Sequence, residues 1–326
     1  MDLIESYAEE LQLIRRPWTR VWVGVLAAGL LLLPWYAPDH VIYIATVIFI
    51  YAVGTLGQNL LIGYTGQISF AQSAFLAIGA FTFGHLARFG IPWPLGLLAA
   101  GLTAGLFGLV VGIPSLRLKG PYLAIATLGF GVATYQVFVN SETLSGGRMG
   151  LIITKLSPLF GLSQITFNYY FYFLIALLFT LITYNIISSY MGRAFIAVRD
   201  NDIAAEVIGV NLTRYKLISF GISSFYTGVQ GGLYGLFLGY LEPNMFTFME
   251  SVTLFVAVII GGLASIEGSI FGAAFVILVP QVLSDYREMV PVVYGVTILL
   301  VLIFQPLGLY GMWFKMRLYF RNWPFR

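Results

Sequence analysis

The chain has no cysteine and few charged residues. Across its 326 residues, the lack of cysteine excludes disulfides, thiolate metal sites and thiol nucleophiles. Charged residues make up 10% of the chain, whereas a soluble domain carries about 25%. His40 and His85 are the only histidines and no carboxylate cluster accompanies them, so metal or acid–base chemistry has little support. Because 59% of the residues are hydrophobic and the mean hydropathy is +0.88, we expect an integral membrane protein.

Long apolar runs take up most of the sequence. Spanning a hydrocarbon core of about 30 Å takes roughly 20 apolar residues as a helix. Ten such helices use about 200 residues, which leaves no room for a separate soluble catalytic domain. We therefore predict an all-α polytopic membrane protein with about ten transmembrane or re-entrant helices. The expected spans are residues 19–37, 40–62, 73–90, 94–114, 121–140, 169–190, 215–240, 251–264, 268–285 and 290–309.

The basic residues predict an orientation. The net charge of +3 fits a bias of basic residues toward cytoplasmic loops better than nucleic-acid binding. With the N-terminus inside, thirteen of the seventeen basic residues fall in inner segments, and only Arg88, Arg148, Lys155 and Arg287 fall outside. Since short basic loops stay in the cytoplasm, we expect both termini to be cytoplasmic. The longest outer loop, residues 141–168, is either a lid, a receptor-docking surface or a simple connector.

Three regions follow from this pattern. Residues 1–18 are expected to form a cytoplasmic amphipathic helix, because apolar residues from Leu3 to Ile14 recur at helical spacing; a solvated helix is the alternative. Residues 19–310 hold the membrane domain, and residues 311–326 form a basic cytoplasmic tail. Within the membrane domain, glycines at GxxxG-like spacing predict close helix packing inside one subunit, in preference to a dimer face. These glycines are Gly101, Gly105, Gly108, Gly112, Gly231, Gly235 and Gly239.

Two segments interrupt the apolar helices. In residues 63–73, GYTGQISFAQS, glycines supply backbone freedom and Gln and Ser side chains supply hydrogen-bond partners. Irregular backbone at membrane depth persists only when it is buried in protein or lines a wet cavity. A helix starting near Ser69 would present free backbone N–H groups suited to an anionic group such as a carboxylate. With a second break at residues 261–269, this pattern indicates a translocation path; two ordinary cytoplasmic turns are the alternative.

A polar island, residues 192–216, separates two later apolar runs. It carries four of the basic residues, and it is expected to hold a short helix. Asp200 is the expected N-cap, Asp202 lies in the first turn and Gly209 ends the helix. Ile203 and Val207 share one face, with Ala204 nearby. The island therefore predicts a docking element for a cytoplasmic partner, in a coupling loop at residues 191–215.

Together these segments resemble the inner-membrane permeases of ABC importers for branched-chain amino acids, the LivM/LivH family. The stretch GYTGQISFAQSAFLAIGAF is similar to that family's GYxGxxSxGxxxFxGIGAY signature, and GPYLAIATLGFG, LSGGRMGL and VIIGGLASIEGSIFGA are similar to its later elements. The island resembles its EAA-type cytoplasmic loop. The resemblance runs from about residue 54 to 275 and is LivM-like. Ala71 and Ala77 stand where the family usually has glycine, which leaves the solute open, since urea and short-amide permeases share these blocks.

The resemblance implies a permease subunit that imports branched-chain or related amino acids by alternating access. It implies a second homologous permease, two cytoplasmic ATP-binding subunits and a periplasmic solute-binding protein, in a bacterial inner membrane with its lipid. The chain lacks the GxxxxGK[ST] phosphate loop, so ATP and Mg are expected in the partner subunits and no cofactor in this chain. The sequence leaves open whether the pore is heterodimeric or homodimeric.

Two sets of candidate residues follow. Those expected to couple to the ATP-binding subunit are Arg199, Asp202, Ala204, Ala205, Glu206 and Gly209. Those expected along the solute path are Gly63, Gly66, Gln67, Ser69, Gln72, Phe75, Tyr122 and Thr127.

Two other classes compete with this interpretation. An ion-coupled secondary transporter needs ionisable groups inside the membrane, and the interiors of the spans have almost none. Glu267 in the second break is a possible proton site, although a carboxylate near a turn more often caps a helix. A membrane enzyme has little support, since no metal or acid–base cluster is evident.

Overall fold

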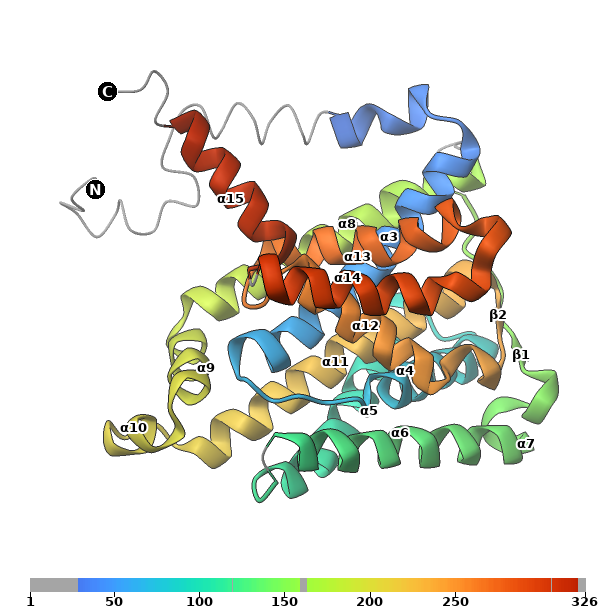
Figure 1. Cartoon of the computed structure of the whole chain (residues 1–326). Coiled ribbons are helices and arrows are strands. Elements are labelled where there is room, and N and C mark those ends of the chain that lie inside the picture. The colour runs from blue at the N-terminus through green and yellow to red at the C-terminus, as the bar shows by residue number, and fades with distance from the viewer. Residues whose placement is uncertain (1–28, 119, 159–162, 306, 322–326) are drawn as a thin grey trace.

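The computed structural model describes residues 29–118, 120–158, 163–305 and 307–321. The expected N-terminal helix, the start of the expected span 19–37 and the last residues of the basic tail lie outside this part of the chain. The described residues are almost entirely helical (Figure 1). The long helices are α3 (Asp39–Asn59), α4 (Gln72–Arg88), α5 (Trp93–Ser115), α6 (Pro121–Asn140), α8 (Gln164–Ser188), α11 (Leu212–Leu238), α12 (Phe248–Gly261), α13 (Ile266–Val282), α14 (Val290–Phe304) and α15 (Gly308–Arg321).

The short elements lie at the two ends of the molecule. They are the π-helical turn η1 (Leu60–Tyr64), α7 (Glu142–Ser145), η2 (Gly147–Met149), α9 (Tyr190–Asp200), α10 (Asp202–Val207), η3 (Pro243–Phe246), η4 (Ser284–Met289) and the strands β1 (Leu151–Ile152) and β2 (Tyr240–Leu241). The two strands pair antiparallel, with Leu151 opposite Leu241. In Figure 1, α9 and α10 lie at one end and α7, β1 and β2 at the other. The expected outer loop 141–168 is thus partly structured, and the expected coupling loop holds two helices.

The structure is that of a polytopic membrane protein with four to five candidate spans. In the described residues, α3 with η1, α5, α6 and α8 are each long and apolar enough to cross a membrane. The bent pair α14 and α15 adds a fifth if it is counted as one span. The count of about ten stays a prediction, because α4, α12 and α13 have 17 residues or fewer and α11 carries many Gly, Ser and other polar residues.

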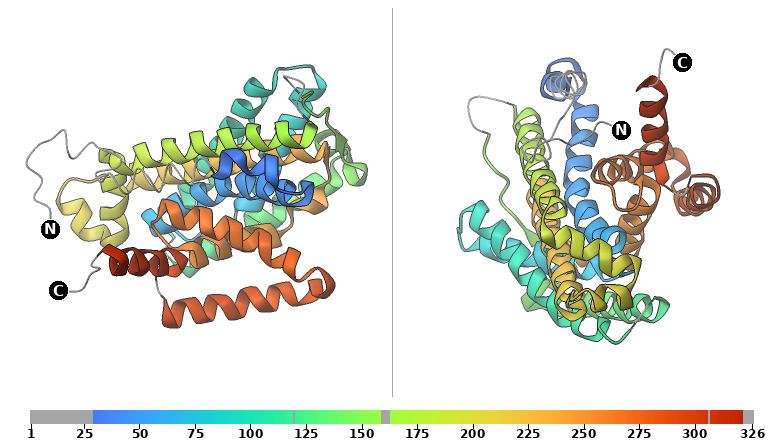
Figure 2. Two further views of the ribbon diagram at one scale, coloured as in Figure 1. Left: turned by 90° about the horizontal axis from the view of Figure 1, so that it is seen from above. Right: turned by 90° about the vertical axis from the view of Figure 1, so that its left-hand side faces the viewer.

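Helix α11 occupies the centre of the bundle and packs on α3, α4 and α5. Glycines bring the backbones together. A Cβ on Gly101 would fall within 3 Å of Phe225, and one on Gly108 would overlap Ser224, so both glycines face α11. Gly231 on α11 lies in the same way against the Leu76 carbonyl of α4. The expected packing of these glycines within one subunit is confirmed. By contrast, α14 lies at the edge of the bundle, where Tyr294 is its buried residue (Figure 2).

Both expected breaks are present, with shifted boundaries. After η1 the chain is non-helical over residues 65–71. The next helix begins at Gln72 rather than near Ser69. In the second break α12 ends at Gly261 and α13 begins at Ile266. The first break and the α9–α10 end lie at the same side of the bundle, as Figure 1 shows.

Candidate functional site

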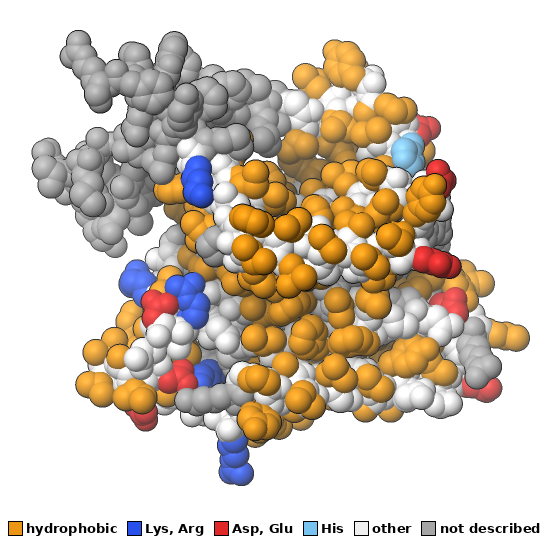
Figure 3. Space-filling model, in the orientation of Figure 1, with side chains coloured by type: hydrophobic (Ala, Val, Ile, Leu, Met, Phe, Trp, Pro, Cys, Tyr) orange, Lys and Arg blue, Asp and Glu red, His pale blue; other side chains and the backbone are white. Residues whose placement is uncertain are grey.

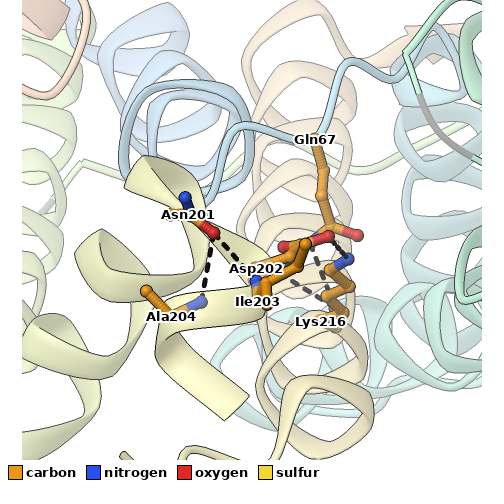
Figure 4. Close-up of polar contacts among 7 residues, drawn as sticks. Gln67, Asn201, Asp202, Ile203, Ala204 and Lys216 are labelled. Atoms are coloured by element: carbon orange, nitrogen blue, oxygen red, sulfur yellow. Dashed lines mark hydrogen bonds and ion pairs between the residues drawn. The ribbon is translucent and has the colours of Figure 1, made fainter. Parts of the chain in front are cut away.

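Helix α10 is capped by Asn201, not by Asp200 as expected. The Asn201 Oδ1 atom accepts hydrogen bonds from the backbone N–H groups of Ile203 at 3.0 Å and Ala204 at 3.1 Å (Figure 4). Asn201 is extended, with φ −162°, so α9 ends at Asp200 and α10 starts two residues later. Asp200 instead pairs with Arg199, whose Nη2 atom lies 2.9 Å from the carboxylate. The expected helix exists, and an amide one residue later satisfies its first N–H groups.

The two faces of α10 differ. Ala205 is 1% exposed and packs in a small cluster with Ala194, Val198 and Val210, so it fixes α10 to α9 rather than facing a partner. Ala204 and Glu206 are exposed. We name the docking face as the three large apolar side chains that α10 and its C-terminal end leave in the open, Ile203, Val207 and Ile208. Gly209 ends the helix with φ +86°, as expected.

An ion pair seats α10 on the central helix. The Lys216 Nζ atom lies 2.9 Å from Asp202 Oδ2, and Lys216 is 9% exposed (Figure 4). Lys216 belongs to the first turns of α11. The ion pair thus links α10 directly to α11, with both charges largely withdrawn from water.

Arg199 joins the α9–α10 segment to the first break. Its Nη1 atom donates to the Gly63 carbonyl at 3.1 Å. Gly66 has φ +72°, and a Cβ there would meet the Arg199 side chain at 3.1 Å. Gly66 is thus required twice, by its backbone conformation and by the close approach of Arg199. Two of the expected solute-path residues therefore contact an expected coupling residue.

A polar seam holds the first break against α3 and α11. The seam consists of Gln58, Gln67, Ser69, Gln72, Ser219, Ser223 and Thr227, all 5% exposed or less. Gln67 Nε2 donates to Ser219 Oγ at 2.7 Å. Gln72 Nε2 donates to Ser223 Oγ at 3.1 Å, and its Oε1 atom accepts from Thr227. The expected path residues of the seam thus bind their own chain, and their contact with a solute stays a prediction.

The remaining expected path residues lie on or near α6. Thr127 is buried, and its hydroxyl accepts a 3.0 Å hydrogen bond from the Phe70 N–H group in the first break. Phe75 is buried and its ring lies 5.8 Å from that of Phe130. Tyr122 differs from these in being 72% exposed, in the first turn of α6.

An anion site is expected at the start of the helix that follows the first break, and this site stays a prediction. The Ser73 N–H group at the start of α4 donates to the Ser251 hydroxyl at 2.8 Å. A helix N-terminus attracts an anion through its unpaired N–H groups, and the Ser73 N–H group already has a partner.

Asn59 is a site residue that sequence reasoning missed. Its Nδ2 atom lies within hydrogen-bond distance of Ser265 O and Ser269 Oγ, both at 2.8 Å, and of Gly262 O at 3.3 Å. Its Oδ1 atom accepts from Ala264 N at 2.9 Å. The adjacent amides Gln58 and Asn59 inside an apolar run, one turn before Gly63, were the available signal.

Two carboxylates bear on the ion-coupled alternative. Glu250, also missed, lies in the first turn of α12 and accepts a 2.9 Å hydrogen bond from Tyr51 on α3. Glu267 is exposed in the first turn of α13, where the helix dipole favours an anion. Among the described residues no group of three His, Asp or Glu side chains is placed to hold a metal ion.

Comparisons with known proteins agree on one family. The family described as branched-chain amino acid transport system / permease component matches residues 40–304. LivM of Salmonella typhimurium, a high-affinity branched-chain amino acid transport system permease protein, is 32% identical, covering 82% of this chain and 69% of the relative. LivM of Escherichia coli is 32% identical, covering 86% of this chain and 72% of the relative. LivH of Escherichia coli is 26% identical, covering 80% of this chain and 91% of the relative. No solved structure matches.

Proposed function

The chain belongs to the family of branched-chain amino acid transport permeases, and we propose that it lines one half of the solute path of an ATP-driven importer. As an ABC permease it is a multi-pass, non-catalytic membrane subunit. The proposed solutes are branched-chain or related amino acids, since the relatives are described by that solute class. Two cytoplasmic ATP-binding subunits would supply the energy, and a periplasmic binding protein would deliver the solute.

The docking face is the observation that carries the coupling role. Three large apolar side chains exposed on a six-residue helix and its C-terminal end are costly in water, and a partner surface would bury them. The helix is held firmly beneath them by the Asn201 cap, the Asp202–Lys216 ion pair and the buried Ala205. Helix α10 with its docking face can therefore transmit movement from an ATP-binding subunit to the helix bundle.

Charge supports a cytoplasmic location for this end. On the face seen in Figure 3, the basic side chains gather at the end that carries α9 and α10. Basic segments are retained in the cytoplasm, so both termini and the coupling segment would lie on the cytoplasmic side of a bacterial inner membrane. The opposite end, with α7, β1 and β2, would then receive the binding protein.

A second permease would complete the path. Helix α6 is mostly exposed along its apolar length, and α14 buries little of its surface in this chain. The exposed apolar surface of a membrane helix is covered either by lipid or by a neighbouring subunit. Because relatives of both the LivM and LivH kinds match this chain, a heterodimer is the proposed pore.

The test is reconstitution of the complex with its ATP-binding subunits and binding protein in liposomes. We expect ATP-dependent leucine uptake that the variant Ile203→Asp loses and the matched variant Ile203→Leu keeps. Ile203 is 74% exposed, so both substitutions spare the packing of the chain and differ in the apolar character of the docking face. Uptake unaffected by Ile203→Asp would contradict the docking role. Uptake by the purified chain alone, driven by an ion gradient, would support a secondary transporter, and competition by urea or short amides would redirect the solute class.

A further inference from the structure

The two helix breaks meet at Asn59. This residue ends α3, one turn before the first break, and is 1% exposed. Its amide binds three groups of the second break and the following helix, Gly262, Ser265 and Ser269, and accepts from a fourth, Ala264. The residues that it joins lie more than 200 positions apart in the chain.

The second break depends on these contacts. Ala264 has φ +54° and is the non-glycine residue with positive φ among the described residues. Such a conformation costs about 1–3 kcal/mol and persists where the surroundings enforce it. The Ala264 N–H group lies outside a helix, where buried backbone groups need partners, and Asn59 Oδ1 is the acceptor that it has. The carbonyls of Gly262 and Ser265 also accept from the Ser265 hydroxyl and from the Ser269 N–H group. Asn59 contacts all three groups.

The first break closes on the same point. A Cβ at Gly63 would overlap both Asn59 Oδ1 and the Ala264 nitrogen. The carbonyl of this same Gly63 accepts the hydrogen bond from Arg199 at the end of α9. A continuous set of contacts therefore runs from the α10 end, through Arg199 and Gly63, to Asn59 and the second break.

We propose that Asn59 is a positioning residue that makes the two breaks move as one unit when α10 is displaced. This inference rests on the proposed importer function, in which a nucleotide-driven partner displaces α10. The Asn59 amide donates to the second break and also accepts from it, so the second break would follow a displacement of Asn59 in either direction. Without it, the first break would still follow Arg199 while the second would not.

A single introduced cysteine can test this, because the chain has none of its own. Leu263 lies in the second break and is partly exposed, so Leu263→Cys reports on that break through its rate of maleimide labelling. Ile203→Cys reports on the docking face. Labelling would be measured on this chain in the full complex, with and without ATP and vanadate. We expect nucleotide to change the rate at both positions by about fivefold or more.

The decisive variant is Asn59→Asp, which keeps the acceptor for the Ala264 N–H group and removes both donors. We expect the nucleotide effect at position 263 to disappear while that at position 203 persists, with ATP hydrolysis continuing and uptake per ATP falling. Asn140→Asp is the matched control, since Asn140 bonds only within α6 in the described contacts. Gly63→Ala disturbs the same junction from the other side and should reproduce the effect.

The outcomes are separable. An unchanged nucleotide effect at position 263 in both Asn59→Asp and Gly63→Ala overturns the proposal. An absent effect at position 263 in the otherwise unaltered chain overturns it too, since the second break then does not move. Should the complex show the labelling pattern but no amino-acid uptake, the link at Asn59 stands and the proposed solute is wrong.

Discussion

The guanidinium of Arg199 donates a hydrogen bond to the backbone carbonyl of Gly63, 136 positions earlier in the chain. Arg199 lies in the last turn of α9, and Gly63 lies in η1, directly before the first break. One contact thus spans the distance between the expected coupling segment and the expected solute path. In the proposed importer, coupling would therefore pass through a direct hydrogen bond between these two segments.

Replacing Arg199 tests this bond. A hydrogen bond that involves a charged group contributes about 1.5–3 kcal/mol, so we expect Arg199→Ala to lower ATP-dependent uptake by about tenfold or more while the complex still assembles. Arg193→Ala is the control, since Arg193 is exposed and contacts Ser188 of its own segment. Equal uptake by the two variants would count against a coupling role for the Arg199–Gly63 bond.

Gly66 is expected to tolerate no side chain. Gly66→Ala should suffer both from its positive φ, at about 1–2 kcal/mol, and from the close approach of Arg199. Gly90→Ala is matched, because Gly90 has φ +74° but nothing lies within 4 Å of a Cβ there. We predict that uptake falls clearly further in Gly66→Ala than in Gly90→Ala, with both chains present in the membrane. A similar loss in both would reduce the role of Gly66 to its backbone conformation.

The ion pair between Asp202 and Lys216 is suited to a double-mutant cycle. Removing one partner leaves the other charge largely buried, so each single variant, Asp202→Asn and Lys216→Met, should destabilise the protein. The double variant should be more stable than the sum of the singles implies, with an interaction energy of about 0.5–3 kcal/mol. Thermal unfolding in detergent measures this. Strict additivity would mean that the pair contributes nothing to seating α10.

Thr127 should stabilise the first break through its hydroxyl. Thr127→Val keeps the shape but leaves the Phe70 N–H group without its acceptor, which costs about 1–3 kcal/mol. Thr180→Val is the control, since the Thr180 hydroxyl bonds to Ala176 of its own helix. We expect a lower unfolding temperature for Thr127→Val, measured by thermal melting; equal melting of the two variants would contradict the assigned bond.

Local patterns predicted local features well. The polar island correctly indicated a short helix ended by Gly209, and the glycine- and serine-rich stretches correctly located both breaks. The N-cap was misplaced by one residue, because Asn201 and Asp200 are both good caps. In the structure Asp200 is the last residue of α9 and pairs with Arg199, and Asn201 is the extended residue that caps α10.

Contacts between distant segments were beyond the sequence. Nothing local shows that Asn59 reaches Ser265, or that the glutamines of the polar seam turn toward α11. These directions are set by helix packing, which a single sequence does not encode in any short window. The same limit affects the span count, since α4 and α12 are too short to judge by length and hydropathy alone.

The pairing of β1 with β2 has a mechanical consequence. Leu151 and Leu241 each belong to a connection that follows a long helix, α6 in one case and α11 in the other. Because two residues of β1 pair with two residues of β2, the two connections are joined to each other. A protein that binds either connection would therefore contact a unit joined to both α6 and α11.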